Sequence, residues 1–136
     1  NKEYSDKNLR CEHGARATCK ICKGRLICPH NNQKYHCKIC DFDNYLKSNI
    51  MNRMYSVLGF SNLSYLGTDI VTYKNYLESK FPSDITWKDY GTKFEIDHIK
   101  PLKAKGITQD EMIRRLHFSN TQPLDPTLNK RKGNKE

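Results

Sequence analysis

All six cysteines and two of the histidines recur near the N-terminus at spacings suited to metal binding. Residues 11–22, CEHGARATCKIC, follow the pattern C-x-H-x5-C-x2-C, and residues 28–40, CPHNNQKYHCKIC, follow C-x-H-x6-C-x2-C. Zinc prefers four nitrogen and sulfur ligands in a tetrahedral arrangement, and repetition at a short period indicates one structural unit used twice. The repeats therefore predict two structural Zn²⁺ sites, with the ligand sets Cys11, His13, Cys19, Cys22 and Cys28, His30, Cys37, Cys40.

The sequence leaves the pairing of these ligands open. Each repeat can close on itself, which we favour, or the last two cysteines of the first repeat can join Cys28 and His30 across the link KGRLI, leaving Cys11 and His13 to Cys37 and Cys40. His36 can also replace His30 as a ligand. Five basic residues alternate with the ligands and form either phosphate contacts or a solvated surface: Lys20, Lys23, Arg25, Lys34 and Lys38.

A second candidate site is the pair Asp97-His98 within FEIDHIKPL, residues 94–102. Neighbouring residues of a regular strand point to opposite faces, so an irregular strand end, before Pro101, is needed to bring both side chains into one cleft. There an aspartate can hold a divalent cation. A neutral histidine, with an ordinary pKa of about 6.5, can take a proton from water.

The context of this pair resembles a known family. The segments EIDHIKP, FSNTQPL and DPTLNKRKGNK are similar to the HNH family of ββα-metal (His-Me finger) nucleases. The wider pattern W-x-x-YG-x-KFEIDHI resembles HNH proteins of large DNA viruses and phages, some of which carry N-terminal Cys/His repeats. The resemblance implies a DNA endonuclease with one catalytic Mg²⁺ or Mn²⁺ on Asp97 and Asn129, His98 as general base, and Asn120 bracing the loop between two strands.

Two features depart from the family pattern. The connection from His98 to Asn120 is longer than usual and contains a predicted helix. The final family position is an asparagine, Asn129, rather than a histidine. Asn120 and Asn129 are nine residues apart, close to the spacing in the HNH domain of RNA-guided CRISPR nucleases. The alternative function is a non-catalytic zinc-finger nucleic-acid-binding protein on a nuclease-like fold.

The charge distribution favours a polyanionic partner. The formal net charge is +9, divided as +6 for residues 1–40, −1 for residues 41–90 and +4 for residues 91–136. Basic surfaces at both ends indicate a nucleic acid, most simply double-stranded DNA. We expect phosphate contacts from Lys100, Lys130, Arg131 and Lys132. Because one active site per chain cuts one strand, breaking a duplex needs a homodimer or two successive cuts.

Periodicity and capping signals predict the elements that position these sites. Apolar residues from Phe42 to Leu58 recur at helical spacing, and a second helix is expected from Asp69 to about Lys80 with Thr68 as N-cap. The last third predicts a strand, a helix over residues 107–118 opened by a Thr108/Glu111 capping box, a strand over residues 121–124, and a helix after Asp125-Pro126.

The expected fold class is α+β, a small ββα-metal core preceded by zinc-binding repeats and a helical connector. The expected domains are residues 1–42, 43–90 and 91–136. No apolar run is long enough to span a membrane, and no signal peptide is visible. We therefore expect an intracellular, reducing compartment in which the thiols are available to a metal.

Overall fold

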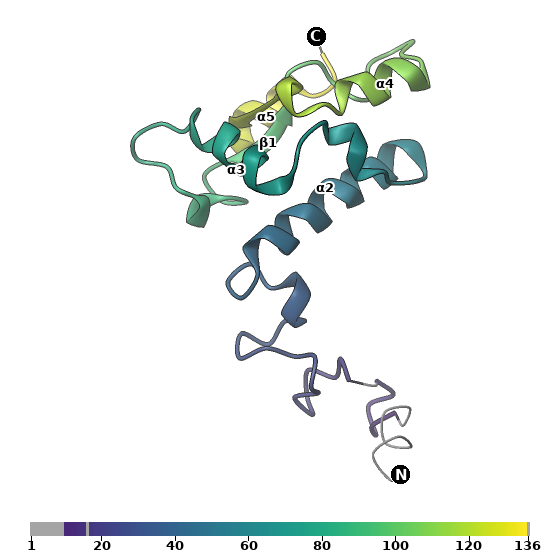
Figure 1. Ribbon diagram of the computed structural model, residues 1–136, viewed down its shortest axis with the longest axis vertical. Helices are drawn as coiled ribbons and strands as arrows, with labels where there is room; N and C mark the ends of the chain where they lie inside the picture. Colours follow the sequence, from purple (N-terminus) through teal and green to yellow (C-terminus); the bar gives the residue numbers. More distant parts are fainter. Residues whose placement is uncertain (1–9, 16, 136) are drawn as a thin grey trace. The chain divides into compact units, whose positions relative to one another are not determined.

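The computed structural model describes residues 10–15 and 17–135 and divides into two compact units, Asn1–Asn49 and Ile50–Glu136 (Figure 1). These units do not follow the boundaries expected after residues 42 and 90. The helix α3, Ile70–Glu78, packs on the strand β2, Thr121–Leu124, so segments expected to form a connector and a nuclease motif share one unit. The α+β class is confirmed.

Before the helix α2, Phe42–Leu58, the described part of the N-terminal unit is built from tight turns. A short 3₁₀-helix, η1, spans Lys34–His36, and an isolated bridge joins Ile27 to Gln33. Gly24 is required by a close approach, because a Cβ there would overlap the carbonyl oxygen of Ala17. The buried apolar side chains among the described residues before α2 are three cysteines and one isoleucine: Cys19, Cys28, Cys37 and Ile27.

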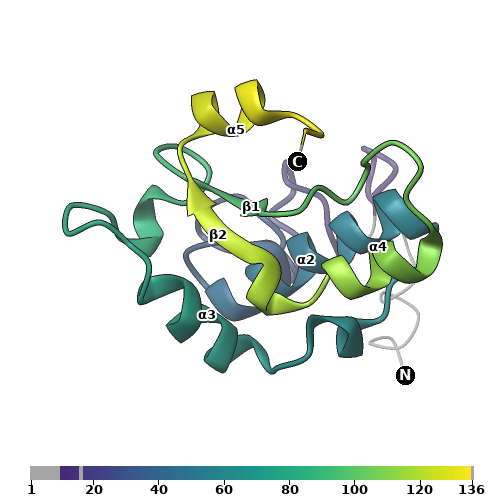
Figure 2. The ribbon, with the colours of Figure 1, turned by 90° about the horizontal axis from the view of Figure 1, so that it is seen from above.

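The C-terminal unit has a two-stranded antiparallel sheet at its centre. Strand β1, Glu95–His98, pairs with β2 so that Asp97 lies opposite Gln122 and His98 lies opposite Thr121. Helix α5, Pro126–Lys132, lies on one side of the strands and α3 on the other (Figure 2). The predicted order of strand, helix, strand and helix is therefore confirmed for the last third of the chain.

Of the remaining helices, α2 has the predicted bounds, whereas α4 is shorter at both ends than the predicted helix over residues 107–118. Helix α2 spans Phe42–Leu58 and α4 spans Gln109–Arg115. Three short 3₁₀-helices complete the described elements: η2 at Leu63–Leu66, η3 at Trp87–Asp89 and η4 at Phe118–Asn120. Within the part of the chain that the structure describes, no helix is long and apolar enough to cross a membrane.

Two capping predictions are corrected. Asp69, not Thr68, is the N-cap of α3, because its carboxylate accepts from the amide of Thr72 at 2.8 Å. Thr108 does cap α4 at the amide of Glu111. The Glu111 carboxylate, however, bonds arginine side chains one turn further along rather than the N-cap amide. A complete capping box occurs instead at Thr86 and Asp89, where η3 begins.

The core of the C-terminal unit packs between α3 and the sheet. The Tyr73 hydroxyl of α3 donates to the Thr121 Oγ1 of β2 at 3.1 Å, so a buried polar pair is satisfied inside this core. Phe81, Trp87 and Phe94 form an aromatic group, and Phe94 directly precedes β1 in the sequence. The buried apolar side chains include Met54, Leu66, Tyr73, Leu77, Phe94, Leu102 and Leu116.

Candidate functional site

Two Cys/His clusters are assembled in the N-terminal unit. In each cluster, the four ligand atoms lie within 4.8 Å of one another. Each cluster comes from a single repeat, so the structure does not cross-pair the repeats. His30, and not His36, belongs to the second cluster. The clusters are Cys11, His13, Cys19, Cys22 and Cys28, His30, Cys37, Cys40.

The distances within the clusters suit a tetrahedral metal. The Nδ1 atom of His13 lies 3.3 to 3.9 Å from the three sulfurs of its cluster. The Nδ1 atom of His30 lies 3.4 to 3.9 Å from its three sulfurs. With metal–ligand lengths typical of zinc, tetrahedral geometry places nitrogen and sulfur ligands about 3.5 Å apart. Both clusters are therefore of the right size to hold one metal ion each.

The thiols of the second cluster differ in acidity. A hydrogen bond from the Cys40 backbone lowers the pKa of Cys37 to about 6. Burial, and then hydrogen bonds with Cys37 and Cys28, raise the pKa of Cys40 to about 11. The thiolate of Cys37 therefore forms readily, whereas burial and the two neighbouring cysteines oppose ionisation of Cys40. A bound divalent cation removes this opposition, because cysteine binds metals as the thiolate.

The first cluster shows the same division. Although burial opposes its ionisation, hydrogen bonds from the His13 backbone and from Cys19 lower the pKa of Cys11 to about 6. Hydrogen bonds with Cys19 and Cys11 raise the pKa of Cys22 to about 12. Each cluster therefore holds one acidic thiol beside a final cysteine of raised pKa, although the acidic thiol is the first cysteine of the first repeat and the second cysteine of the second repeat.

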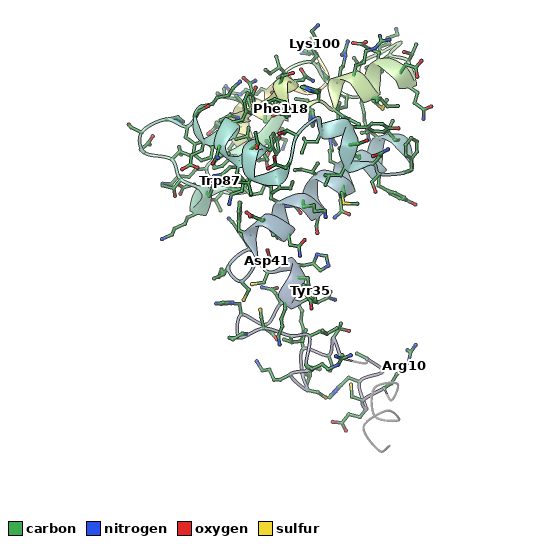
Figure 3. All side chains as sticks on the ribbon, viewed as in Figure 1. Arg10, Tyr35, Asp41, Trp87, Lys100 and Phe118 are labelled. Carbon is green, nitrogen blue, oxygen red and sulfur yellow. The ribbon has the colours of Figure 1, made fainter. Side chains whose placement is uncertain are left out.

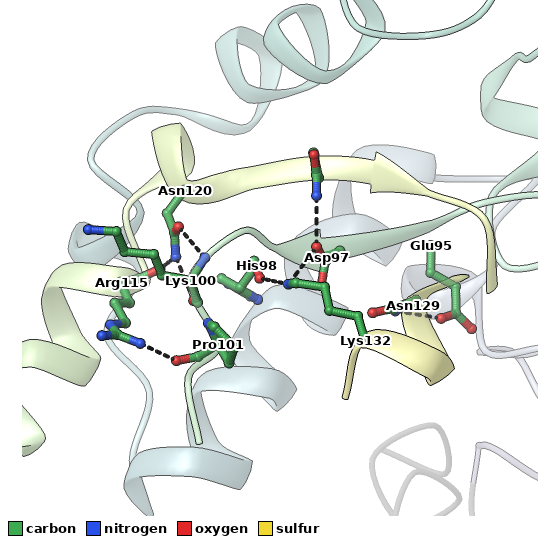
Figure 4. A network of polar contacts seen from close by, with 10 residues as sticks. Glu95, Asp97, His98, Lys100, Pro101, Arg115, Asn120, Asn129 and Lys132 are labelled. Atoms are coloured by element: carbon green, nitrogen blue, oxygen red, sulfur yellow. Dashed lines mark hydrogen bonds and ion pairs between the residues drawn. The ribbon is translucent and has the colours of Figure 1, made fainter. Parts of the chain in front are cut away.

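In the C-terminal unit, the buried carboxylate of Asp97 is held by groups from β2 and α5 (Figure 4). Gln122 Nε2 donates to it at 3.0 Å across the strand pair. The Lys132 ammonium lies 2.9 Å from both carboxylate oxygens and also donates to the main-chain oxygen of His98. Asp97 therefore lies in an oxygen-lined position that already attracts a cation.

A second contact between β1 and α5 lies beside the first. Asn129 Nδ2 donates to Glu95 Oε2 at 2.9 Å. Glu95 and Asp97 are two residues apart on a strand and share one face, and Asn129 and Lys132 are three apart on a helix and share one face. The structure thus brings the predicted metal ligands Asp97 and Asn129 to the same interface of β1 and α5, each with a partner of its own.

The His98 ring makes no hydrogen bond at this interface, where only the main-chain oxygen of His98 accepts a bond, from Lys132. Pairing of β1 continues through His98, so the expectation of an irregular strand end that brings the Asp97 and His98 side chains into one cleft is wrong, and the backbone becomes irregular only at Ile99. On a regular strand these two side chains point to opposite faces, although the charges of Asp97 and Lys132 still act on the His98 ring. Burial, and then the charge of Arg53, lower the pKa of His98 to about 4, although Asp97 opposes the shift. Among the described residues, neither ring nitrogen of His98 has a hydrogen-bond partner. The ring is therefore neutral near pH 7 and able to accept a proton.

Asn120 joins the two ends of the long connection between the strands. Its Oδ1 accepts from the amide of Lys100 at 2.8 Å, and its Nδ2 donates to the carbonyls of Lys100 and Arg115 at 3.0 and 2.8 Å. The amide of Ile99 also donates to the carbonyl of Asn120 at 2.8 Å. Three of these four bonds fix the backbone directly after His98, and the fourth ties it to the end of α4, which is an arrangement suited to a bracing residue.

The predicted basic contacts occupy different positions. Lys132 is engaged by Asp97, whereas Lys100, Lys130 and Arg131 are exposed. His117 is the N-cap of η4, where its Nδ1 accepts from the amide of Ser119. A Cβ at Gly67 would overlap the His117 ring, so this histidine packs against the backbone at Gly67.

Glu95, Gln122 and the role of Lys132 were missed in the sequence. The signals were nevertheless present. Glu95 precedes Asp97 by two residues, the spacing that places both side chains on one face of a strand. Lys132 follows Asn129 by three residues, the spacing that places both on one face of a helix. Gln122 becomes the partner of Asp97 only through the strand register, which the sequence does not fix across a long connection.

Comparisons with known proteins give two similar chains, both from Acanthamoeba polyphaga mimivirus. Uncharacterized protein L426 is 29% identical over 101 residues, which cover 70% of this chain and 44% of the relative. Uncharacterized protein L246 is 26% identical over 85 residues, which cover 59% of this chain and 38% of the relative. The chain thus spans less than half the length of these curated relatives. No family model matches the chain, and no solved structure matches it.

Proposed function

We propose that the protein is a divalent-metal-dependent DNA endonuclease whose N-terminal unit holds two structural zinc ions. The zinc assignment is supported by eight ligands in two closed clusters, since a site with four protein ligands and no open position is structural. The nuclease assignment is supported by the β1 and α5 interface. The observation that carries it is the buried Asp97 carboxylate. This carboxylate binds the Lys132 ammonium, and Lys132 shares one face of α5 with Asn129.

The residues present fit a hard cation at Asp97. The Lys132 ammonium is held there by two carboxylate oxygens and one carbonyl oxygen, and oxygen ligands are those that Mg²⁺ and Mn²⁺ prefer. Asp97 and Asn129 would hold the ion. When bound, such an ion neutralises the scissile phosphate and stabilises the leaving oxygen.

His98 supplies the proton acceptor in this proposal. Its ring is neutral because burial lowers its pKa, and its nitrogens have no competing partner in the described part of the chain. A neutral imidazole can take a proton from the attacking water. Asn120 fixes the backbone that follows His98, and Glu95 orients the amide of Asn129 by accepting from its Nδ2. Each of these residues has a separate and testable role.

A second candidate function is a non-catalytic nucleic-acid-binding module. The observation that favours it is the Asp97–Lys132 ion pair, which satisfies the buried carboxylate without any metal. A site that has lost catalysis would keep such a pair for stability alone. The two functions therefore differ in whether a divalent cation displaces Lys132.

Incubation of the full chain with supercoiled plasmid and Mg²⁺ or Mn²⁺ tests the proposal. We expect nicked or linear products, and loss of about 10² to 10⁴ in rate for His98→Ala, the usual contribution of a general base. His36→Ala is the matched control, because His36 is exposed and outside both clusters. Cleavage by His98→Ala at the native rate would misplace the active site, and no cleavage by any form would favour the binding module.

A further inference from the structure

Among the described residues before α2, more large apolar side chains are exposed than buried. Ile21 and Ile39 are 71% and 72% exposed, whereas Ile27 is buried and Leu26 is half-buried. Tyr35, which is 61% exposed, is labelled in Figure 3. Large aliphatic residues are usually among the most buried. Here the clusters of metal ligands, rather than apolar packing, hold the turns together, which leaves these three side chains at the surface.

The two exposed isoleucines occupy the same position in the two repeats. Ile21 is the third residue of CKIC at residues 19–22, and Ile39 is the third residue of CKIC at residues 37–40. The cysteines on either side belong to a cluster, and in the first copy the amide of Cys22 also approaches Cys19 Sγ at 3.4 Å. Each isoleucine is therefore presented by a turn that is fixed at both ends, and the same presentation occurs twice.

The charge around these turns is predominantly positive, with Glu12 and Asp41 as the nearest acidic residues on either side. Residues 17–40 contain five Lys or Arg and no Asp or Glu. Four of these cations are exposed, namely Lys20, Lys23, Arg25 and Lys34. A surface that combines apolar side chains with an excess of positive charge fits a partner that presents anions beside apolar faces. Nucleic acids have that chemistry wherever bases are unpaired or unstacked, because phosphates then flank accessible base faces.

We propose that the Ile21 and Ile39 turns bind a nucleic acid at unpaired or unstacked bases. The isoleucines pack against base faces, Tyr35 offers a ring for stacking, and the exposed cations contact the flanking phosphates. This inference shares with the proposed function only its nucleic-acid partner and requires no cleavage. The binding test can therefore succeed where the nuclease assay fails, and the nuclease assay can succeed where the binding test fails.

Fluorescence anisotropy with the zinc-loaded full chain tests the inference in buffer without Mg²⁺ or chelator. The probes are a labelled single-stranded oligonucleotide, the same strand with abasic positions, and a blunt duplex. We expect Ile21→Ser with Ile39→Ser to weaken binding to the single strand about tenfold, from the apolar area no longer buried. The slope of affinity against salt should not change. Lys20→Gln with Lys34→Gln should instead reduce that slope by about 1.4, the value for two phosphate contacts on a single strand.

Val71→Ser is the matched control, because Val71 is 59% exposed but lies in the C-terminal unit. Unchanged zinc content in the isoleucine variant shows that the turns are intact. Native affinity of that variant for the single strand would overturn the inference, as would an equal loss of affinity for the abasic strand. Concentration-dependent self-association that the two serines abolish, with oligonucleotide binding unaffected, would assign the isoleucines to a second copy of the chain and would also overturn it.

Discussion

Lys132 is the residue that decides how Asp97 is used. Its ammonium is bound by a carboxylate with little solvent around it, so a divalent cation and Lys132 compete for the same oxygens. We expect Lys132→Met to be less stable than the native chain by about 3 kcal/mol without divalent metal, because it leaves a buried charge unpaired. It should also bind Mn²⁺ more tightly.

Thermal unfolding of zinc-loaded protein with and without Mn²⁺ measures both effects of this change. The variant should gain more in Tm from Mn²⁺ than the native chain does. Lys130→Met is the control, since Lys130 is exposed on the same helix and should alter stability by less than about 0.5 kcal/mol. Equal Mn²⁺ responses in all three proteins would show that no divalent ion reaches Asp97.

His98 makes stability depend on pH. Burial lowers its pKa in the folded chain to about 4, against about 6.5 when unfolded. The unfolded chain therefore binds more protons between these values, so His98 contributes its full stability above pH 6.5 and loses it progressively towards pH 4. We expect the native chain to lose up to about 3 kcal/mol more than His98→Gln over this interval. Urea unfolding at pH 7 and pH 4.5 measures the difference, and parallel curves would contradict the assignment.

At this scale, the sequence predicted residue types better than contacts. The metal ligands of the N-terminal unit could be recognised because Cys and His recur at short spacings along one segment. The partners of Asp97 come from residues 25 and 35 positions away, and no local pattern specifies them. The distance along the chain, rather than the chemistry of the residues, therefore limited the prediction.

Helix α5 carries both Asn129 and Lys132, so its first turn controls the interface with β1. The Asp125 carboxylate accepts from the amides of Thr127 and Leu128 at 2.8 and 3.1 Å. We expect Asp125→Ala to cost about 1 kcal/mol through loss of this cap and to raise the Mn²⁺ concentration needed for binding. Asp110→Ala is the control, because Asp110 lies in the first turn of α4 without being its cap. Urea unfolding and Mn²⁺ titration of both variants measure the result.

The elements were predicted where local chemistry determines them. Asp125-Pro126 fixed the start of α5, and the apolar spacing from Phe42 fixed α2. The N-cap of α3 was misplaced by one residue because Thr68 and Asp69 both can cap, and only the bond from Thr72 distinguishes them. The 3₁₀-helices were not predicted, since a single turn carries no periodicity.

For the whole molecule, the zinc proposal predicts a definite stoichiometry. Two closed clusters predict two zinc ions per chain, and Cys22→Ser should reduce this to about one by opening the first cluster. His36→Ala should leave the content unchanged, because His30 completes the second cluster. Mass spectrometry under native conditions measures the bound metal. A loss of zinc from His36→Ala equal to the loss from His30→Ala would contradict the ligand assignment.

The outer edge of β2 has a consequence for contacts between copies of this chain. The amide of Ile99 donates to the carbonyl of Asn120, so these two residues form a hydrogen-bonded pair of the antiparallel ladder. Hydrogen-bonded and non-hydrogen-bonded pairs alternate, which makes Ile96 and Pro123 a non-hydrogen-bonded pair and turns the nitrogen of Pro123 outward. Pro123 has no N–H to donate. The amide of Thr121 donates to the carbonyl of Phe118, and the carbonyl of Thr121 accepts a hydrogen bond from the hydroxyl of Tyr76. No N–H along this edge of β2 is left to pair with an incoming strand. The β2 edge of the sheet is thereby protected from edge-to-edge aggregation, and a twofold dimer would have to form through a surface other than this edge.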